Sequence, residues 1–125
     1  MLGFLNTDNQ LTAYTFLSTI DSDIVIACID DFVKQLTQRT VLVIDNAKIH
    51  TSDAFFDRIG IWEAKGLEIF HLPTYSPQLN LIEILWLKMK YQWIDFSAYL
   101  SFSHLVEYVE KVIINFGTEY QINFV

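Results

Sequence analysis

A short apolar run that ends in an acid constrains the fold of this chain more than any other feature. Residues 41–44 read Val-Leu-Val-Ile, and Asp45 follows at once, before a polar stretch. Four aliphatic residues without polar alternation are typical of a strand buried on both faces, which we expect to be central and parallel to a neighbour. Open α/β sheets place their chemistry at the carboxyl ends of such strands. The segment therefore predicts an α/β domain that carries a carboxylate at one end of its sheet.

The remaining apolar spacing predicts a mixed sheet covered by helices. Strands are expected over 3–6, 11–17, 41–44 and 67–72, with a hairpin joining the first two. Helices are expected over about 23–38, from Thr51 or Ser52 to Gly66, over about 80–93 and over 103–116. Asp21 or Ser22 is expected to cap the first helix, and Ser103 the last. The order is β-β-α-β-α-β-α-α, which favours a single α/β domain.

The first and the last of these helices each show an apolar stripe. The stripes are Val25, Cys28, Phe32 and Leu36 in the first helix, and Leu105, Val109, Val112 and Phe116 in the last.

Composition narrows the class of protein. The chain has 125 residues, 52% of them apolar, which suits one globular domain with a real core. No apolar run reaches the roughly 18 residues of a membrane helix, and the single cysteine, Cys28, fits a reducing cytoplasm. The net charge of −7 argues against a domain that binds DNA tightly by itself, but not against a catalytic domain.

A second acid lies on a helix that follows a stiff loop. Pro73 and Pro77 bracket the loop and restrict its backbone, and Tyr75 and Ser76 offer hydroxyls there. Glu83 follows in a helix that apolar residues nearly surround. Its apolar stripe comprises Ile82, Leu85, Trp86, Met89 and Trp93. A carboxylate there must be paired, hydrogen-bonded or bound to a metal. Asp45 and Glu83 together therefore suggest a shared divalent metal.

Structural alternatives stand beside these assignments. Asp45 can simply close a turn, and Glu83 can form a capping box with Asn80. His50 and His71 invite a zinc site with the two acids, although no tight ligand spacing supports it.

Two further residue types have simple interpretations. Lys48 is a candidate phosphate contact. The tryptophans fit apolar stripes and are expected in the core: Trp62, Trp86 and Trp93.

Two strings resemble a known family. Residues 43–50, Val-Ile-Asp-Asn-Ala-Lys-Ile-His, and residues 72–86, Leu-Pro-Thr-Tyr-Ser-Pro-Gln-Leu-Asn-Leu-Ile-Glu-Ile-Leu-Trp, closely resemble the DDE catalytic domain of bacterial insertion-sequence transposases related to the mariner group. The pair of motifs is highly specific, and the resemblance extends over nearly all of residues 1–125. It implies a ribonuclease-H-like fold and a transposase that cuts DNA and joins it to a target.

The resemblance also implies a site. Three acids bind two Mg²⁺ or Mn²⁺ ions about 3.5–4 Å apart, which clamp the attacking and leaving oxygens of a phosphoryl transfer. Asp45 matches the second acid and Glu83 the third. Asn46 and His50 match the family motif, and with Lys48, Tyr75, Ser76 and Asn80 they are expected beside the active site. Transposon ends and target DNA are the implied partners, with no membrane.

One part of the family pattern has no match. The family's first acid lies on a central first strand, upstream of the strand that Gly3–Asn6 resembles. The sequence therefore predicts an N-terminally truncated transposase domain, either a decayed remnant or the second part of a frameshifted reading frame. Catalysis is expected to be impaired, and the alternative is a non-catalytic module that pairs with another transposase chain.

Overall fold

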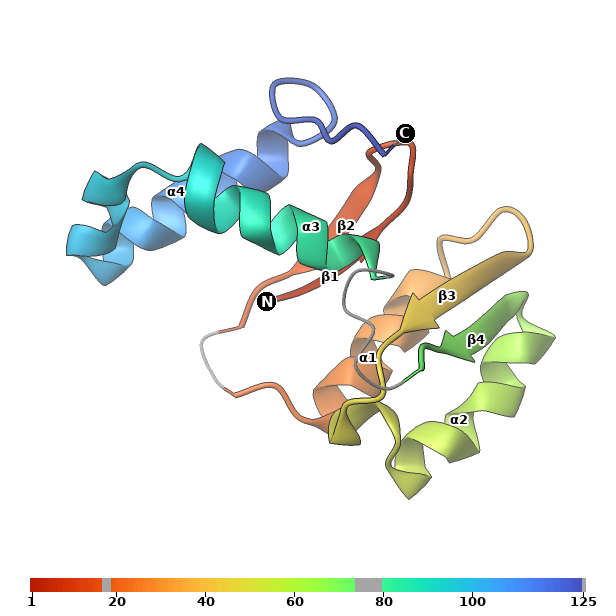
Figure 1. Ribbon diagram of the computed structural model, residues 1–125. Helices are drawn as coiled ribbons and strands as arrows, with labels where there is room; N and C mark the ends of the chain where they lie inside the picture. Colours follow the sequence, from red (N-terminus) through yellow and green to blue (C-terminus); the bar gives the residue numbers. More distant parts are fainter. Residues whose placement is uncertain (17–18, 74–79, 125) are drawn as a thin grey trace. The chain divides into compact units, whose positions relative to one another are not determined.

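The computed structural model of the chain describes residues 1–16, 19–73 and 80–124 (Figure 1). It forms two compact units. Unit 1 comprises Met1–Leu2 and Tyr14–Asn80, and unit 2 comprises Gly3–Ala13 and Leu81–Val125. The element order agrees with the predicted one, and the mixture of helices and small sheets is compatible with a ribonuclease-H-like fold. The expected lack of a first central strand stays a prediction.

Unit 1 is built around a β-α-β segment. Helix α1 (Ser22–Val33) precedes strand β3 (Thr40–Ile44), the 3-10 turn η1 (Lys48–His50), helix α2 (Asp53–Ala64) and strand β4 (Leu67–His71). The two strands are parallel, as predicted, and their register runs from Thr40 opposite Leu67 to Ile44 opposite His71. Both strands therefore end at the same edge of the sheet.

Side-chain caps fix where the two helices of unit 1 begin. Asp21 accepts a hydrogen bond from the Ile24 amide at 2.9 Å, and Ser52 accepts one from the Phe55 amide at 3.2 Å. Each resolves a pair of alternatives that the sequence left open. Gly66, with φ of +95°, lies between α2 and β4 as predicted, because a left-handed residue commonly ends a helix.

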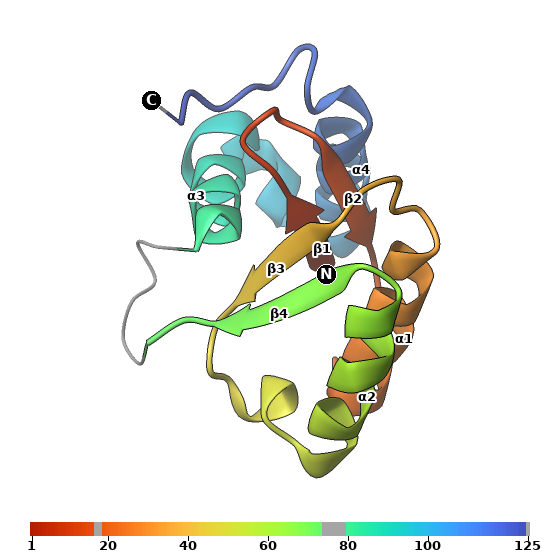
Figure 2. The same ribbon diagram turned by 90° about the vertical axis from the view of Figure 1, so that its right-hand side faces the viewer.

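One face of the β3–β4 sheet carries the core of unit 1. Figure 2 shows α1 and α2 on the same side of the two strands. The side chains of Phe55, Trp62 and Leu67 are fully buried. On the opposite face Val41, Val43 and Phe70 are 55%, 41% and 55% exposed. The prediction that β3 is buried on both faces is therefore wrong. Among the described residues, strand β3 pairs with β4 alone, in a two-stranded sheet.

Unit 2 combines a hairpin with a pair of helices. Strands β1 (Leu2–Leu5) and β2 (Leu11–Tyr14) form the hairpin, although Leu2 and Tyr14 themselves belong to unit 1. Helix α3 (Leu81–Lys88) continues as the π-helical turn η3 (Met89–Trp93), and the 3-10 turn η4 (Phe96–Leu100) leads to helix α4 (Phe102–Asn115).

Small and polar residues lock the hairpin into unit 2. Gly3 lies so close to α3 that a Cβ atom there would be 3.1 Å from Ile82 and 3.2 Å from Trp86. Asn9, with φ of +59°, pairs with the backbone of Ile122 through both side-chain atoms, at 2.6 and 3.0 Å. These contacts tie the first and last segments of the unit together.

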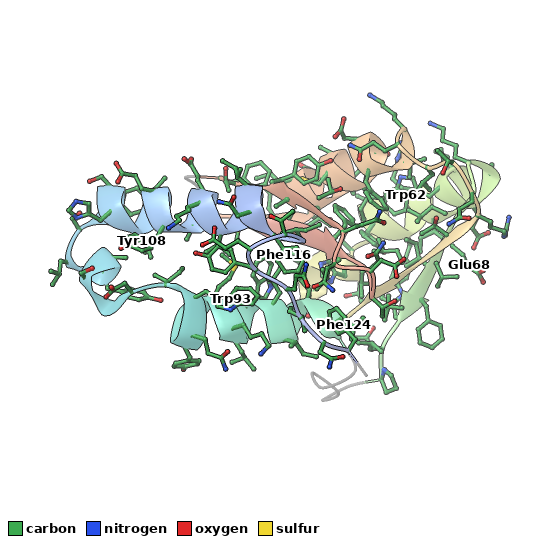
Figure 3. All side chains as sticks on the ribbon, turned by 90° about the horizontal axis from the view of Figure 1, so that it is seen from above. Trp62, Glu68, Trp93, Tyr108, Phe116 and Phe124 are labelled. Carbon is green, nitrogen blue, oxygen red and sulfur yellow. The ribbon has the colours of Figure 1, made fainter. Side chains whose placement is uncertain are left out.

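Aromatic packing joins the two helices of unit 2. Trp93 packs against Phe116 (Figure 3) with ring centroids 6.1 Å apart. It also packs against Tyr120, with ring centroids 5.2 Å apart. Leu85 and Met89 are buried, whereas Leu87 is 56% exposed. Helix α3 is therefore not surrounded by apolar neighbours as the sequence suggested.

Several predicted boundaries need correction. Helix α1 ends at Val33, and its next three residues form bonds to carbonyls only three positions back, so the expected stripe stops before Leu36. Strand β2 ends at Tyr14, three residues before the predicted end at Leu17, which lies outside the described residues. Helix α4 is capped by Ser101, which accepts from the His104 amide at 3.2 Å, and not by Ser103.

Across residues 1–16, 19–73 and 80–124, no helix has the length and apolar character needed to cross a bilayer.

Candidate active site at the end of strand β3

Asp45 lies immediately after β3, where the strand order and register bring the ends of β3 and β4 together. Its side chain is 48% exposed. The carboxylate oxygen Oδ1 accepts a hydrogen bond from the Ala47 amide at 3.0 Å, which closes the turn that leads into η1. The turn-closing alternative is thus correct for Oδ1. Within residues 1–16, 19–73 and 80–124, no residue forms a hydrogen bond with Oδ2.

His50 holds the same oxygen from the other side. Its Nδ1 lies 2.8 Å from Asp45 Oδ1 and 3.3 Å from the Asp45 carbonyl oxygen. Both of these atoms are acceptors, so Nδ1 must carry the proton and donate. The imidazole packs against the Phe55 ring at 6.1 Å and is only 16% exposed. The sequence motif placed His50 beside Asp45, and the structure brings the two together.

His71 supports His50 from β4. His71 Nε2 lies 2.8 Å from the His50 carbonyl oxygen, so this nitrogen donates. The ring also packs against Phe55 at 5.9 Å and Phe56 at 5.7 Å. Sequence reasoning considered His71 only as a zinc ligand and missed this role. The signal was its position at the end of a strand, where the parallel register sets it opposite Ile44.

Asn46 connects the segments that follow the two strands. Its side-chain amide donates to the Leu72 carbonyl at 2.7 Å, and the Leu72 amide donates to the Ile44 carbonyl at the same distance. Lys48 lies two residues after Asn46, at the start of η1, and is exposed to solvent. The end of β3 therefore collects Asp45, Asn46, Lys48 and His50, as the sequence predicted.

Other predicted site residues lie elsewhere. Glu83 is half-buried in the first turn of α3 and belongs to unit 2, whereas Asp45 belongs to unit 1. Asn80 is half-buried and directly precedes α3, and its capping box with Glu83 stays a prediction. Tyr75 and Ser76 lie outside the described residues.

Neither of two further candidate chemistries is built into the described part of the chain. No group of three or more His, Cys, Asp or Glu side chains that could hold a metal occurs within it, so the described residues lend the zinc alternative no support. Cys28 is buried against the core of unit 1, and burial, followed by the charge of Asp31, raises the pKa of its thiol. A raised pKa keeps the thiol protonated and unreactive at neutral pH.

Comparison with known proteins identifies the family. The model of the family described as DDE superfamily endonuclease matches residues 1–106, most of the chain. Neither the search of curated proteins nor the search of solved structures gave a match. The matched range contains β3, the turn with His50, β4 and α3. The chain therefore belongs to the DDE superfamily of endonucleases.

Proposed function

We propose that this chain is a catalytic domain of a transposase related to the mariner group of insertion sequences. Endonucleases of the DDE superfamily act on DNA and generally use divalent metal ions. The observation that carries the proposal is the carboxylate of Asp45. It stands half-exposed at the end of β3, with one oxygen fixed by two donors and the other without a protein partner in the described structure.

The donor atoms at this position suit Mg²⁺ or Mn²⁺. Both ions prefer carboxylate and other oxygen ligands, and the open Oδ2 of Asp45 is such a ligand. Asp45 and Glu83 are the residues that we propose to hold the metal ions. When bound, such ions stabilise the charge that develops on the oxygens of a phosphoryl transfer.

In this proposal the remaining residues contact the DNA or support the structure of the site. The exposed ammonium of Lys48 is available to a DNA phosphate near Asp45. Asn46 fixes the start of the segment after β4 through its bond to Leu72. Asn80, Tyr75 and Ser76 belong to the stretch between β4 and Glu83 and are proposed as further neighbours of the site.

The motifs assign only two of the family's three acids to residues of this chain. We therefore propose that the isolated chain cleaves DNA weakly. The alternative is a non-catalytic remnant or binding module that pairs with another transposase chain.

Nicking of supercoiled plasmid tests the proposal. The full 125-residue chain is incubated with Mn²⁺ or Mg²⁺, and Asp45→Asn and Glu83→Gln are compared with Asp57→Asn. Asp57 is an exposed acid on α2 of unit 1, so its variant controls for the loss of a negative charge. We expect slow, metal-dependent nicking that both site variants lose and the control keeps.

Binding of Mn²⁺, measured by electron paramagnetic resonance, separates the two candidates. Metal binding that Asp45→Asn weakens, without nicking by the chain alone, would favour the module that needs a partner. Nicking that survives in Asp45→Asn would refute the assignment of this acid. A folded chain that neither binds Mn²⁺ nor nicks DNA would refute the proposed catalytic function.

A further inference from the structure

Two histidines form a chain of hydrogen bonds that ends on Asp45. His71 donates from Nε2 to the His50 carbonyl at 2.8 Å, and His50 donates from Nδ1 to Asp45 Oδ1 at 2.8 Å. Because each acceptor is an oxygen without a hydrogen, the proton positions on both rings follow from the geometry. Neutral His50 is therefore the Nδ1–H tautomer, and neutral His71 the Nε2–H tautomer.

The surroundings of the two rings leave them little freedom. His71 is set by the β3–β4 ladder opposite Ile44 and packs against Phe55 and Phe56 of α2. His50 ends the short turn η1 and packs against Phe55 as well. Phe55 is fully buried, so both imidazoles rest on a rigid part of the core.

The two oxygens of Asp45 are consequently unequal. Oδ1 accepts from the Ala47 amide at 3.0 Å and from the His50 ring, whereas no described residue donates to Oδ2. A carboxylate held in this way cannot rotate about its Cβ–Cγ bond without breaking both hydrogen bonds. Its open oxygen therefore keeps one direction before any ligand arrives.

We propose that His50 and His71 are positioning residues that commit Oδ1 of Asp45 to the protein, so that Asp45 offers a metal ion Oδ2 alone. The inference rests on the proposed function, because it takes Asp45 to be a metal ligand. Second-shell hydrogen bonds to a ligand fix its orientation and strongly influence metal affinity. His50 acts directly on Asp45, and His71 acts through the backbone of His50.

Matched amide variants test the hydrogen bonds one nitrogen at a time. In His50→Asn the side-chain amide takes the place of Nδ1, whereas in His50→Gln it takes the place of Nε2. His71→Gln keeps a donor near the Nε2 position, and His71→Leu removes it. All four are made in the full chain, with heteronuclear spectra to check that the fold is kept.

Affinity for Mn²⁺, measured by electron paramagnetic resonance, is the first readout. We expect His50→Gln to weaken binding about tenfold or more, the size typical of lost second-shell support, and His50→Asn to retain most of it. His71→Leu should weaken binding less than His50→Gln, and His71→Gln should restore it. Equal affinity in wild type and His50→Gln would overturn the inference. Equal losses in His50→Asn and His50→Gln would also overturn it, because the donor that His50→Asn keeps at the Nδ1 position would then not support metal binding.

The protonation of the rings is a second readout that needs no metal. Long-range ¹H–¹⁵N spectra of the metal-free chain above neutral pH should show His50 protonated on Nδ1 and His71 on Nε2. The opposite tautomer on either ring would overturn the inference even in a chain that binds Mn²⁺. Wild-type chain that shows these tautomers but binds no Mn²⁺ would overturn the proposed metal site and with it the role of Oδ2. Failure of the inference and failure of the proposed function thus give different results.

Discussion

The side-chain amide of Asn46 donates to the carbonyl of Leu72 at 2.7 Å and so joins the segments that follow the two parallel strands β3 and β4. The Leu72 amide completes the connection by donating to Ile44. The bond fixes the spacing of the segments that leave β3 and β4, and one of them carries Asp45.

Loss of the Asn46 amide should loosen this end of the sheet. Asn46→Ala leaves the carbonyl of buried Leu72 without its donor, and we expect a cost of about 1–2 kcal/mol in the free energy of unfolding. Urea denaturation measures the cost, and amide exchange at Leu72 localises it. Asn115→Ala is the control, because its amide donates to the Lys111 carbonyl in an exposed position of unit 2. An equal loss in both variants would contradict a special role for Asn46.

Acid should weaken unit 1 through Asp30. Burial would raise the pKa of Asp30, but hydrogen bonds from Arg58 at 2.6 Å and Trp62 at 2.8 Å, with the charges of Arg58 and Lys65, outweigh it and lower the pKa. A lowered folded-state pKa gives stability that is present above the unfolded pKa of about 3.9 and is lost as the pH falls through the folded value.

Asp30→Asn should remove that pH dependence. The variant is expected to lose about 1 kcal/mol near neutral pH, at the low end for a charged bond because the Asp30 side chain is 36% exposed. Near pH 2 the variant and wild type should unfold alike. Denaturation at both pH values checks this, and a constant difference between the proteins would refute the linkage.

Alkaline pH should lower the stability of the fold as the Tyr14 phenol ionises. Burial, followed by the hydrogen bond to Asp31 and the charge of that residue, raises the pKa of the Tyr14 phenol. A raised pKa gives stability that is fully present below the unfolded value of about 10 and is lost as the pH rises towards the folded value. Titration of absorbance near 295 nm should show one of the six tyrosines ionising after the others. Tyr14→Phe should remove this late step, and a variant that still shows it would refute the assignment.

The Asn9 side chain should control the order of the C-terminal segment. Asn9→Ala removes both bonds to the Ile122 backbone and puts a poorly suited residue at φ of +59°, so we expect a loss of about 2–3 kcal/mol. Asn9→Asp keeps the acceptor for the Ile122 amide and loses only the donor, so its loss should be smaller. Amide exchange at Ile122 measures both. Unchanged exchange in Asn9→Ala would show that other contacts hold the segment.

Local sequence patterns predicted most of the helices and strands of unit 1. The unbroken apolar run before Asp45, the cap at Ser52 and the left-handed Gly66 set β3, α2 and β4 because each depends on neighbours in the sequence. The motif also placed His50 beside Asp45, since a single short turn separates them.

Long-range relationships escaped sequence reasoning. His71 reaches His50 only because the parallel register sets it opposite Ile44, and register is not visible in a single strand. The exposure of Val43 depends on what covers the second face of the sheet, which an apolar run does not specify. Helix α1 stops at Val33 although its apolar spacing continues, and the residues that follow bond to carbonyls three positions back.

The hydrogen bonds that orient the Asp45 carboxylate come from residues close to it in the sequence. The two bonds to Asp45, and the bonds that support its neighbours Asn46 and His50, all join residues between Asp45 and Leu72, within one turn-helix-strand segment. The donors that direct the carboxylate are thus encoded in one contiguous stretch of sequence. Substitutions elsewhere can accumulate without removing these donors, provided that they keep the contacts that hold the stretch against α1, such as the bonds of Arg58 and Trp62 to Asp30.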